Sequence, residues 1–158
     1  MVFIPAARGR RIFLTGTSGT GRRTVGALLE AQHGFCHVPV FSPSRVRAAL
    51  DRLRELDATS PGRDVVVVTS EACAPAVAGF LLESGFERVW LDADRGAARP
   101  RSDWSDRPGW AARFVDPFDA DGAFRPFERV VADVLASHAT SAPARDRSFP
   151  EAAGRLAT

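Results

Sequence analysis

The stretch that decides the fold is RIFLTGTSGTGRRTV, residues 11–25. It opens with four residues of strand character, Ile12–Thr15, and continues into a loop with glycines at positions 16, 19 and 21. From Val25 onward the apolar side chains recur at helical spacing. A strand, a glycine-rich turn and a helix form a layout that binds phosphate. Glycines let successive N–H groups point inward, and the helix N-terminus adds the positive end of its dipole.

The loop departs from the usual phosphate-binding motif at its end. That motif finishes in Gly-Lys-Ser/Thr, whereas here Gly21 is followed by Arg22, Arg23 and Thr24. All 21 basic residues of the chain are arginines, so a general drift towards arginine is one reason for the substitution. An ammonium group follows a moving phosphoryl group, whereas a guanidinium clamps it at two points. We therefore expect phosphate binding to survive the change better than catalysis.

These residues resemble the P-loop nucleotide and small-molecule kinases, the group that contains adenylate, gluconate and shikimate kinases. Many gluconate-kinase-like chains carry G-x-S-G-x-G-K-S-T-V at this place. The positions of this chain that are in step are Gly16, Ser18, Gly19, Gly21, Thr24 and Val25. The resemblance implies a bound nucleoside triphosphate, ATP, together with Mg²⁺. It also implies transfer of the γ-phosphate to a small acceptor if the protein is active.

The resemblance places the phosphates of the nucleotide on the loop, and the binding residues are Gly16, Ser18, Gly19, Thr20, Gly21, Arg22, Arg23 and Thr24. Backbone N–H groups of residues 18–23 would cradle the β-phosphate, and Arg22 would reach the β/γ oxygens as a catalytic cation. Thr24 is the candidate magnesium ligand, through water. An anion would also offset the charges of Arg22 and Arg23, since each cation in the first turn of a helix costs very roughly 0.3–1 kcal/mol. The alternative is that both side chains extend into water, where screening makes this cost tolerable.

A second catalytic candidate follows the third predicted strand. The run 64–70 contains four successive valines, which predicts a strand buried on both faces of a parallel sheet. P-loop enzymes often place a magnesium-organising aspartate near the end of such a strand, but here Glu71 follows Ser70. The resemblance gives Glu71 a magnesium or general-base role. Capping of the next helix explains Ser70 and Glu71 equally well.

The candidates for acceptor binding lie on the helix predicted from Arg45 to about Leu56. The serine of the preceding turn, residues 41–44, is expected to cap this helix. In the nucleotide kinases this region carries the acceptor, and an arginine commonly meets the acceptor's phosphate. Arg45 and Arg47 are therefore the substrate-binding candidates. The alternative is a solvated face in a chain rich in arginine.

The segment from Asp94 to Arg113 corresponds to the lid region of the same kinases, whose arginines close over the transferred phosphate. Here it carries several arginines, of which Arg95 and Arg99 are the catalytic candidates, and it is shorter than a lid domain. An arginine-rich flap is the functional interpretation. An exposed loop that tryptophans hold against the surface is the alternative.

The order of elements predicts an α/β protein, specifically a three-layer α/β/α P-loop fold with a five-stranded parallel sheet. The phosphate site is expected at the carboxyl ends of the strands. One domain covers residues 1–137, and residues 138–158 form a tail without apolar periodicity. The predicted strands are 12–15, 35–40, 64–70, 86–91 and 114–116. The first predicted helix ends at about His33, and the other three cover residues 45–56, 72–84 and 123–137. Pro126 favours a later start of the last helix.

Composition excludes several classes of function. A formal net charge of +2 is too small to indicate nucleic-acid binding. Cys36 and Cys73 lie in apolar stretches without CxxC spacing, which favours buried thiols over a disulfide or a metal site. No segment has the pattern of a signal peptide or a membrane span, so we expect a cytoplasmic protein that contacts no membrane.

Two functions from different classes remain open. In the first, the chain is an ATP-dependent kinase for a small metabolite, with nucleotide and acceptor as its ligands. In the second, it is a catalytically lapsed kinase-like module that binds nucleotide or phosphate and acts through a protein partner. DNA or RNA is an unlikely partner, because no basic stripe with interleaved aromatic residues is visible outside the segment 95–113.

Overall fold

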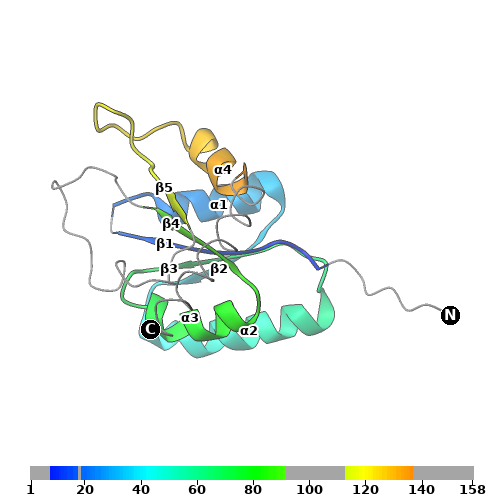
Figure 1. Cartoon of the computed structure of the whole chain (residues 1–158). Helices are drawn as coiled ribbons and strands as arrows, with labels where there is room; N and C mark the ends of the chain where they lie inside the picture. The colour runs from blue at the N-terminus through cyan, green and yellow to red at the C-terminus, as the bar shows by residue number, and fades with distance from the viewer. Residues whose placement is uncertain (1–7, 18, 92–112, 137–158) are drawn as a thin grey trace, which may run out of the picture.

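All five predicted strands form, and they pair in parallel to give one sheet with the order β2-β3-β1-β4-β5 (Figure 1). The computed structural model describes residues 8–17, 19–91 and 113–136. The strands are β1 (Arg11–Gly16), β2 (Cys36–Val40), β3 (Val65–Thr69), β4 (Glu87–Leu91) and β5 (Arg113–Val115). The α/β prediction with a five-stranded parallel sheet is therefore confirmed.

β1 lies at the centre of the sheet. Its residue Phe13 is opposite Val67 of β3 on one side and Arg88 of β4 on the other. Gly16, the last residue of β1, lies opposite Leu91, the last residue of β4. In a parallel sheet the carboxyl ends of neighbouring strands meet at one edge, and ligands bind there. The glycine loop begins at that edge.

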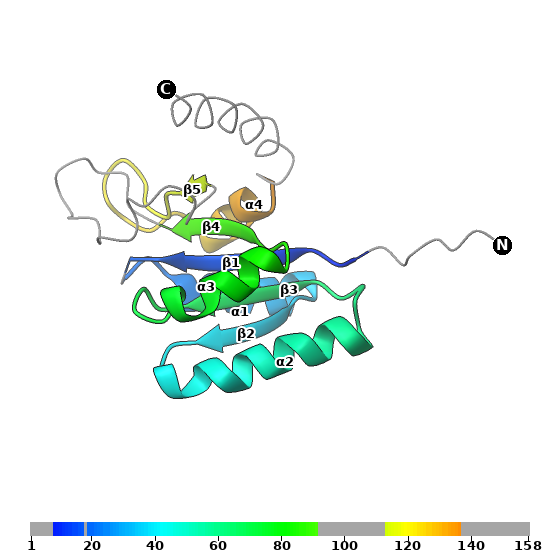
Figure 2. The same ribbon diagram turned by 60° about the horizontal axis from the view of Figure 1, so that its bottom comes forward.

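Helices form a layer on each face of the sheet (Figures 1 and 2). α1 and α4 cover one face, and α2 and α3 cover the other (Figure 1). Their bounds are α1 (Arg22–His33), α2 (Val46–Thr59), α3 (Ala74–Glu83) and α4 (Phe127–Ala136), with a 3₁₀ turn, η1 (Pro43–Arg45), before α2. No helix of the described part of the chain combines the length and apolarity needed to cross a bilayer.

The core consists of two apolar clusters, one on each face of the sheet, because successive side chains of a strand point to opposite faces. Val65 and Val67 pack towards α2 and α3, whereas Val66 and Val68 pack towards α1 and α4. All four valines of β3 are fully buried, which confirms the prediction of a strand covered on both faces. Both cysteines are free and buried, as predicted.

Some predicted boundaries were wrong by one to four residues. α2 begins at Val46 rather than Arg45, because Pro43 starts a 3₁₀ turn in which the Arg45 N–H donates to the Ser42 carbonyl. The expected serine cap does not form, since the Ser42 and Ser44 hydroxyls hydrogen-bond each other at 3.0 Å. α4 begins at Phe127, directly after Pro126, which agrees with the helix-breaking effect of proline.

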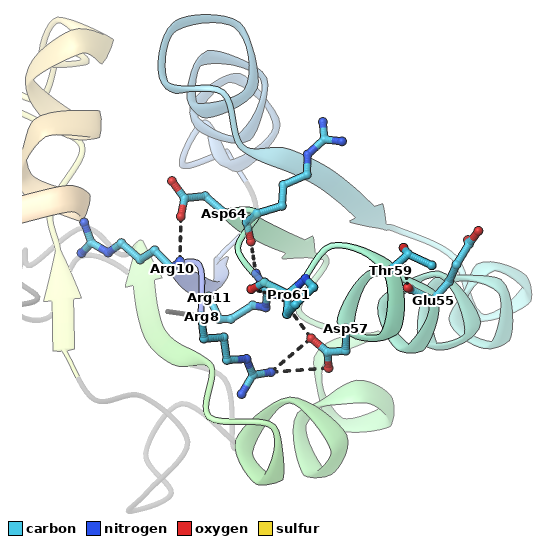
Figure 3. Close-up of polar contacts among 9 residues, drawn as sticks. Arg8, Arg10, Arg11, Glu55, Asp57, Thr59, Pro61 and Asp64 are labelled. Atoms are coloured by element: carbon cyan, nitrogen blue, oxygen red, sulfur yellow. Dashed lines mark hydrogen bonds and ion pairs between the residues drawn. The ribbon is translucent and has the colours of Figure 1, made fainter. Parts of the chain in front are cut away.

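Arginines and carboxylates form a polar network at the amino ends of the strands (Figure 3). The glycine loop follows the other end of β1. The Arg11 side chain is buried, and its guanidinium donates to the carbonyls of Arg63 and Pro61 and to Asp57, 3.1 Å away. The Arg8 guanidinium also pairs with Asp57. Asp57 thereby joins the C-terminal part of α2 to the start of β1.

Arg10 extends the same network towards the opposite layer. Its backbone N–H donates to Asp64 at 2.7 Å, and its guanidinium pairs with Glu87 at 3.3 Å and reaches the Val134 carbonyl of α4. We call the complete set the amino-end arginine network: Arg8, Arg10, Arg11, Asp57, Asp64 and Glu87.

Candidate functional site

The glycine loop has the backbone geometry that its sequence predicts. β1 ends at Gly16, and α1 begins at Arg22 directly after its N-cap, Gly21. Gly19 and Gly21 have φ angles of 81° and 82°, which L side chains rarely adopt. A Cβ atom on Gly16 would lie 2.1 Å from the Leu91 carbonyl oxygen, so β1 can approach β4 this closely only through glycine.

The backbone N–H groups of the loop are available to a ligand. Within the described residues, the N–H groups of residues 19–24 have no hydrogen-bond partner. The N-cap of α1 makes no side-chain hydrogen bond, and the first turn contains no acidic residue. Thr20 is fully buried, and its hydroxyl donates to the Thr17 carbonyl at 2.7 Å, which braces the loop from within. These free donors, at the positive end of a helix dipole, form a cradle for an anion.

Arg22 bridges the ends of two strands beneath this cradle. Its Nη1 atom donates to the Gly16 carbonyl of β1 at 2.7 Å and to the Thr69 carbonyl of β3 at 3.1 Å. The side chain is therefore folded onto the sheet, and its predicted contact with the β/γ oxygens of a nucleotide stays a prediction. Nε and Nη2 make no hydrogen bond to the described residues, so one edge of the guanidinium stays free.

The surroundings of Arg22 are only partly polar. Burial lowers the pKa of its guanidinium, the charge of Glu71 opposes this shift, and the charge of Arg23 adds to it. The group remains protonated, because an arginine does not lose its proton in proteins. No carboxylate of the described residues lies within ion-pair distance of Arg22, so its charge is incompletely compensated.

Arg23 is exposed and stacks on an aromatic ring. Its Cζ atom lies 4.1 Å from the ring centroid of Phe41, and that of Arg22 lies 5.8 Å from the same centroid. A cation over a phenylalanine face gains about 0.5–1 kcal/mol at an exposed site. Phe41 was not among the site residues predicted from the sequence. The signal that could have identified it is its position directly after β2. Arg23 is thus held at the loop by a contact with the residue that follows β2.

Glu71 and Thr69 provide buried oxygen atoms near Arg22. Neither Oε1 of Glu71 nor Oγ1 of Thr69 has a hydrogen-bond partner among the described residues, although both atoms are buried. The Ser70 hydroxyl accepts a hydrogen bond from the Cys73 N–H at 3.2 Å in the turn before α3, whose N-cap, Cys73, makes no side-chain hydrogen bond. Glu71 makes no such bond, which leaves its carboxylate available for the magnesium or base role that stays a prediction.

The described residues fit a protein-held magnesium ion poorly. Arg23 stands where the usual motif has its metal-binding hydroxyl, and Thr24 is exposed one position later. In the described part of the chain no group of three or more His, Cys, Asp and Glu side chains is arranged to hold a metal. Glu71 is the carboxylate whose charge Arg22 experiences.

The remaining candidates are either exposed or outside the described residues. Arg45 ends η1 and Arg47 lies in the first turn of α2, and both side chains are exposed. Their acceptor-binding role stays a prediction. Ser18, Arg95 and Arg99 lie outside the described residues, as does the predicted tail.

An aromatic cluster that sequence reasoning missed lies beside the loop. It consists of Phe118, Phe124 and Phe127, with ring centroids 4.7 Å apart for the first pair and 5.4 Å for the second. A Cβ atom on Gly21 would lie 2.6 Å from the Phe127 ring, so the cluster abuts the N-cap of α1. Phe124 is 46% exposed. Its side chain presents an apolar surface next to the anion cradle.

The architecture is a parallel sheet whose central strand ends in a glycine loop, and a helix begins directly after that loop. The fold is a three-layer α/β/α P-loop fold. The sequence matches no family profile and no curated protein. Two solved structures are similar: a gluconokinase from Sinorhizobium meliloti 1021 and a mutant of the Mycobacterium tuberculosis APS kinase CysC.

The gluconokinase is 18% identical, with a TM-score of 0.49 over 90% of this chain and 99% of its own. The APS kinase is 17% identical, with a TM-score of 0.42 over 81% of this chain and 95% of its own. Such values do not decide an activity. The fold assignment therefore rests on the sheet and the loop of this chain.

Proposed function

We propose that the chain binds a nucleoside triphosphate, ATP, through the loop of residues 16–24. The observation that carries this proposal is the run of N–H groups at residues 19–24 that have no partner among the described residues, in a loop with two left-handed glycines, Gly19 and the N-cap Gly21. Backbone donors of a glycine loop at a helix N-terminus are suited to phosphate oxygens, because the positive end of the helix dipole adds to their attraction. The loop therefore supplies most of the hydrogen bonds that a β-phosphate needs.

Arg22 takes the place of the usual lysine in this proposal. Its Nη1 atom is held by the carbonyls of Gly16 and Thr69, so its orientation is fixed before a ligand arrives. The free Nε and Nη2 edge matches two phosphate oxygens, as in the two-point pairing typical of arginine. A bound phosphate would also compensate the half-buried charge of Arg22. Arg22 thus acts as a clamp on the β- and γ-phosphates.

The nucleobase has a matching surface on Phe124. This ring is 46% exposed and stacks with Phe127, which in turn contacts the N-cap Gly21. Stacking of a base on an aromatic side chain contributes about 1–3 kcal/mol. The turn that carries Phe124 is braced, since the Asp119 carboxylate accepts the N–H groups of Asp121 and Ala123. We therefore place the base against Phe124.

Phosphoryl transfer to a small acceptor is the second candidate function, and Glu71 is the observation that favours it. Its buried Oε1 atom has no described partner and lies in the electrostatic range of Arg22. A carboxylate in this position is suited to accept the proton of an acceptor hydroxyl while Arg22 holds the transferred group. Without turnover, the same site describes a lapsed kinase-like module that acts through a protein partner.

Thermal melting with and without millimolar ATP tests the binding proposal. At a hundredfold excess over the dissociation constant, a ligand stabilises by about 2.7 kcal/mol, which raises the Tm of a chain of this size by about 5–10 °C. We expect this shift for the wild type and for Arg52→Ala, an exposed α2 control, but not for Arg22→Ala. An equal shift in Arg22→Ala, or none in the wild type, would contradict the proposal.

Release of ADP in the presence of candidate acceptors separates the two functions. Steady release that Glu71→Gln abolishes supports phosphoryl transfer. Turnover that appears only in Arg22→Lys identifies a lapsed kinase. Binding without turnover in any variant favours the module that acts through a partner.

A further inference from the structure

The usual P-loop places a serine or threonine hydroxyl directly after its lysine, and this hydroxyl holds Mg²⁺. Here the corresponding residue is Arg23, whose guanidinium is 4.1 Å from the Phe41 ring centroid. We propose that this loop binds its triphosphate without a divalent cation, with Arg22 and Arg23 neutralising the charge that Mg²⁺ neutralises elsewhere. This inference rests on the proposed nucleotide binding and adds that the bound nucleotide carries no divalent cation.

Both guanidinium groups are held in place by contacts that do not involve a ligand. Nη1 of Arg22 is bound by the Gly16 and Thr69 carbonyls, and the ring of Phe41 supports Arg23 from below. Two fixed cations, Arg22 and Arg23, thus open the helix that follows the glycine loop before a ligand binds. Fixed charges neutralise an anion more effectively than mobile ones, because no side-chain entropy is lost when the ligand arrives. The pair therefore has the character of a preformed phosphate clamp.

The same arrangement disfavours a divalent cation at the phosphate oxygens. An ion bound there would face the charges of Arg22 and Arg23 and the positive end of the α1 dipole. The first turn of α1 contains no acidic residue that would offset this repulsion. In the described part of the chain no metal-binding cluster of three side chains is present, and the charge of Glu71 acts on Arg22. The loop thus favours ATP with its full negative charge over the magnesium complex.

Calorimetric titration of the wild-type chain with ATP, once in EDTA and once in millimolar Mg²⁺ at equal ionic strength, tests this inference. We expect the Kd in EDTA to be equal to or lower than the Kd in Mg²⁺. Binding that is more than about threefold tighter in Mg²⁺ overturns the inference and leaves the proposed function intact. Absence of binding in both buffers overturns the proposed function and this inference together.

The variant Arg23→Ser restores a hydroxyl at the metal position. We expect it to bind ATP about tenfold more weakly than the wild type in EDTA and to gain affinity on addition of Mg²⁺. Arg52→Ser is the matched control, because it removes one exposed arginine from α2 with the same change of net charge. Both substitutions replace an exposed side chain, and melting curves verify that the two variants fold. If the two variants have the same Kd in each buffer, Arg23 has no specific role and the inference is wrong.

Discussion

The two ends of the sheet use arginine in different ways. At the amino end, the guanidinium groups of Arg8, Arg10 and Arg11 all pair with carboxylates, and those of Arg10 and Arg11 also donate to carbonyls of other segments. Figure 3 shows the pairing of Arg8 with Asp57. At the carboxyl end, Arg22 meets two carbonyls and Arg23 meets an aromatic ring, and neither pairs with a described carboxylate. The first group holds the layers together. The second retains positive charge for an anion that the chain itself does not supply.

Backbone donors show the same contrast. The Arg10 N–H at the amino end is taken by Asp64, and the Val65 N–H is taken by the Arg10 carbonyl. The N–H groups of residues 19–24 have no partner among the described residues. The paired N–H groups at the amino end contribute to stability. The loop N–H groups at the carboxyl end are left for the ligand that we propose. Substitutions at the two ends should therefore separate unfolding free energy from ligand affinity.

The largest loss of stability is expected for Arg11→Ala. This change removes the Arg11 donor of the Arg63 carbonyl, one of the two donors of the Pro61 carbonyl, which keeps the Gly9 N–H, and one partner of Asp57. Since lost partners of buried polar groups cost about 1–3 kcal/mol each, we expect a loss of about 2–4 kcal/mol in unfolding free energy. Urea denaturation measures this value. Under conditions in which the variant is folded, its ATP affinity should equal that of the wild type.

A comparison of two loop glycines sharpens the account of the carboxyl end. Gly19 and Gly21 share a positive φ, but a Cβ on Gly21 would strike the Phe127 ring whereas a Cβ on Gly19 meets no atom within 4 Å. Gly21→Ala should therefore cost about 2–3 kcal/mol, and Gly19→Ala about 1 kcal/mol. Denaturation curves of both variants give the difference. Equal costs would show that the aromatic cluster does not constrain the loop.

Arg22→Ala should affect ligand affinity much more than stability. Hydrogen bonds to charged groups contribute about 1.5–3 kcal/mol, so the Kd for ATP should rise by roughly 10- to 100-fold. The unfolding free energy should change by less than about 1 kcal/mol, because relief from burial of the charge offsets the lost bonds to Gly16 and Thr69. Titration and urea denaturation of the same preparation measure both values. A stability loss as large as that of Arg11→Ala would remove the distinction between the two ends.

The smallest expected effect is a pH dependence of stability, which does not involve the arginines of either end of the sheet. His37 of β2 is half-buried, its Nε2 atom has no partner among the described residues, and burial lowers its pKa from about 6.5 against the opposing charge of Glu30. As the pH falls, His37 is therefore protonated in the unfolded chain before it is protonated in the folded chain. The free energy of unfolding should decrease as the pH drops below about 6.5. His37→Gln should reduce this slope, whereas His33→Gln, an exposed control on α1, should not. Denaturation at a series of pH values tests the difference.

Local signals in the sequence were sufficient for the fold and for the loop backbone. The valine run of β3, the glycine pattern of residues 16–21 and the C-cap Gly34 each specify geometry within a few residues. They predict the strand, the anion cradle and the end of α1 without knowledge of distant contacts. The correct prediction of the architecture follows from these elements and their spacing.

The side-chain environment of the site could not be predicted in the same way. Phe41 reaches Arg23 only because β2 and β1 are brought into one sheet, and Phe127 reaches Gly21 only because α4 packs beside α1. The position of Arg22 depends on the Thr69 carbonyl, which is 47 residues away. These three features arise from tertiary packing and carry no local pattern. The start of α2 was wrong for a local reason, because Pro43 begins a 3₁₀ turn in which the Arg45 N–H donates to the Ser42 carbonyl.

The most direct test of the central claim is a two-dimensional amide NMR spectrum recorded during titration with ATP. We predict that the amide signals of Gly19, Gly21 and Arg22 shift saturably, because their N–H groups receive phosphate oxygens. The signals of Arg10 and Val65 at the amino end, whose N–H groups already have partners, should remain in place. Absence of shifts in the loop, or shifts that appear only at the amino end, would contradict the assignment of the glycine loop as the nucleotide site.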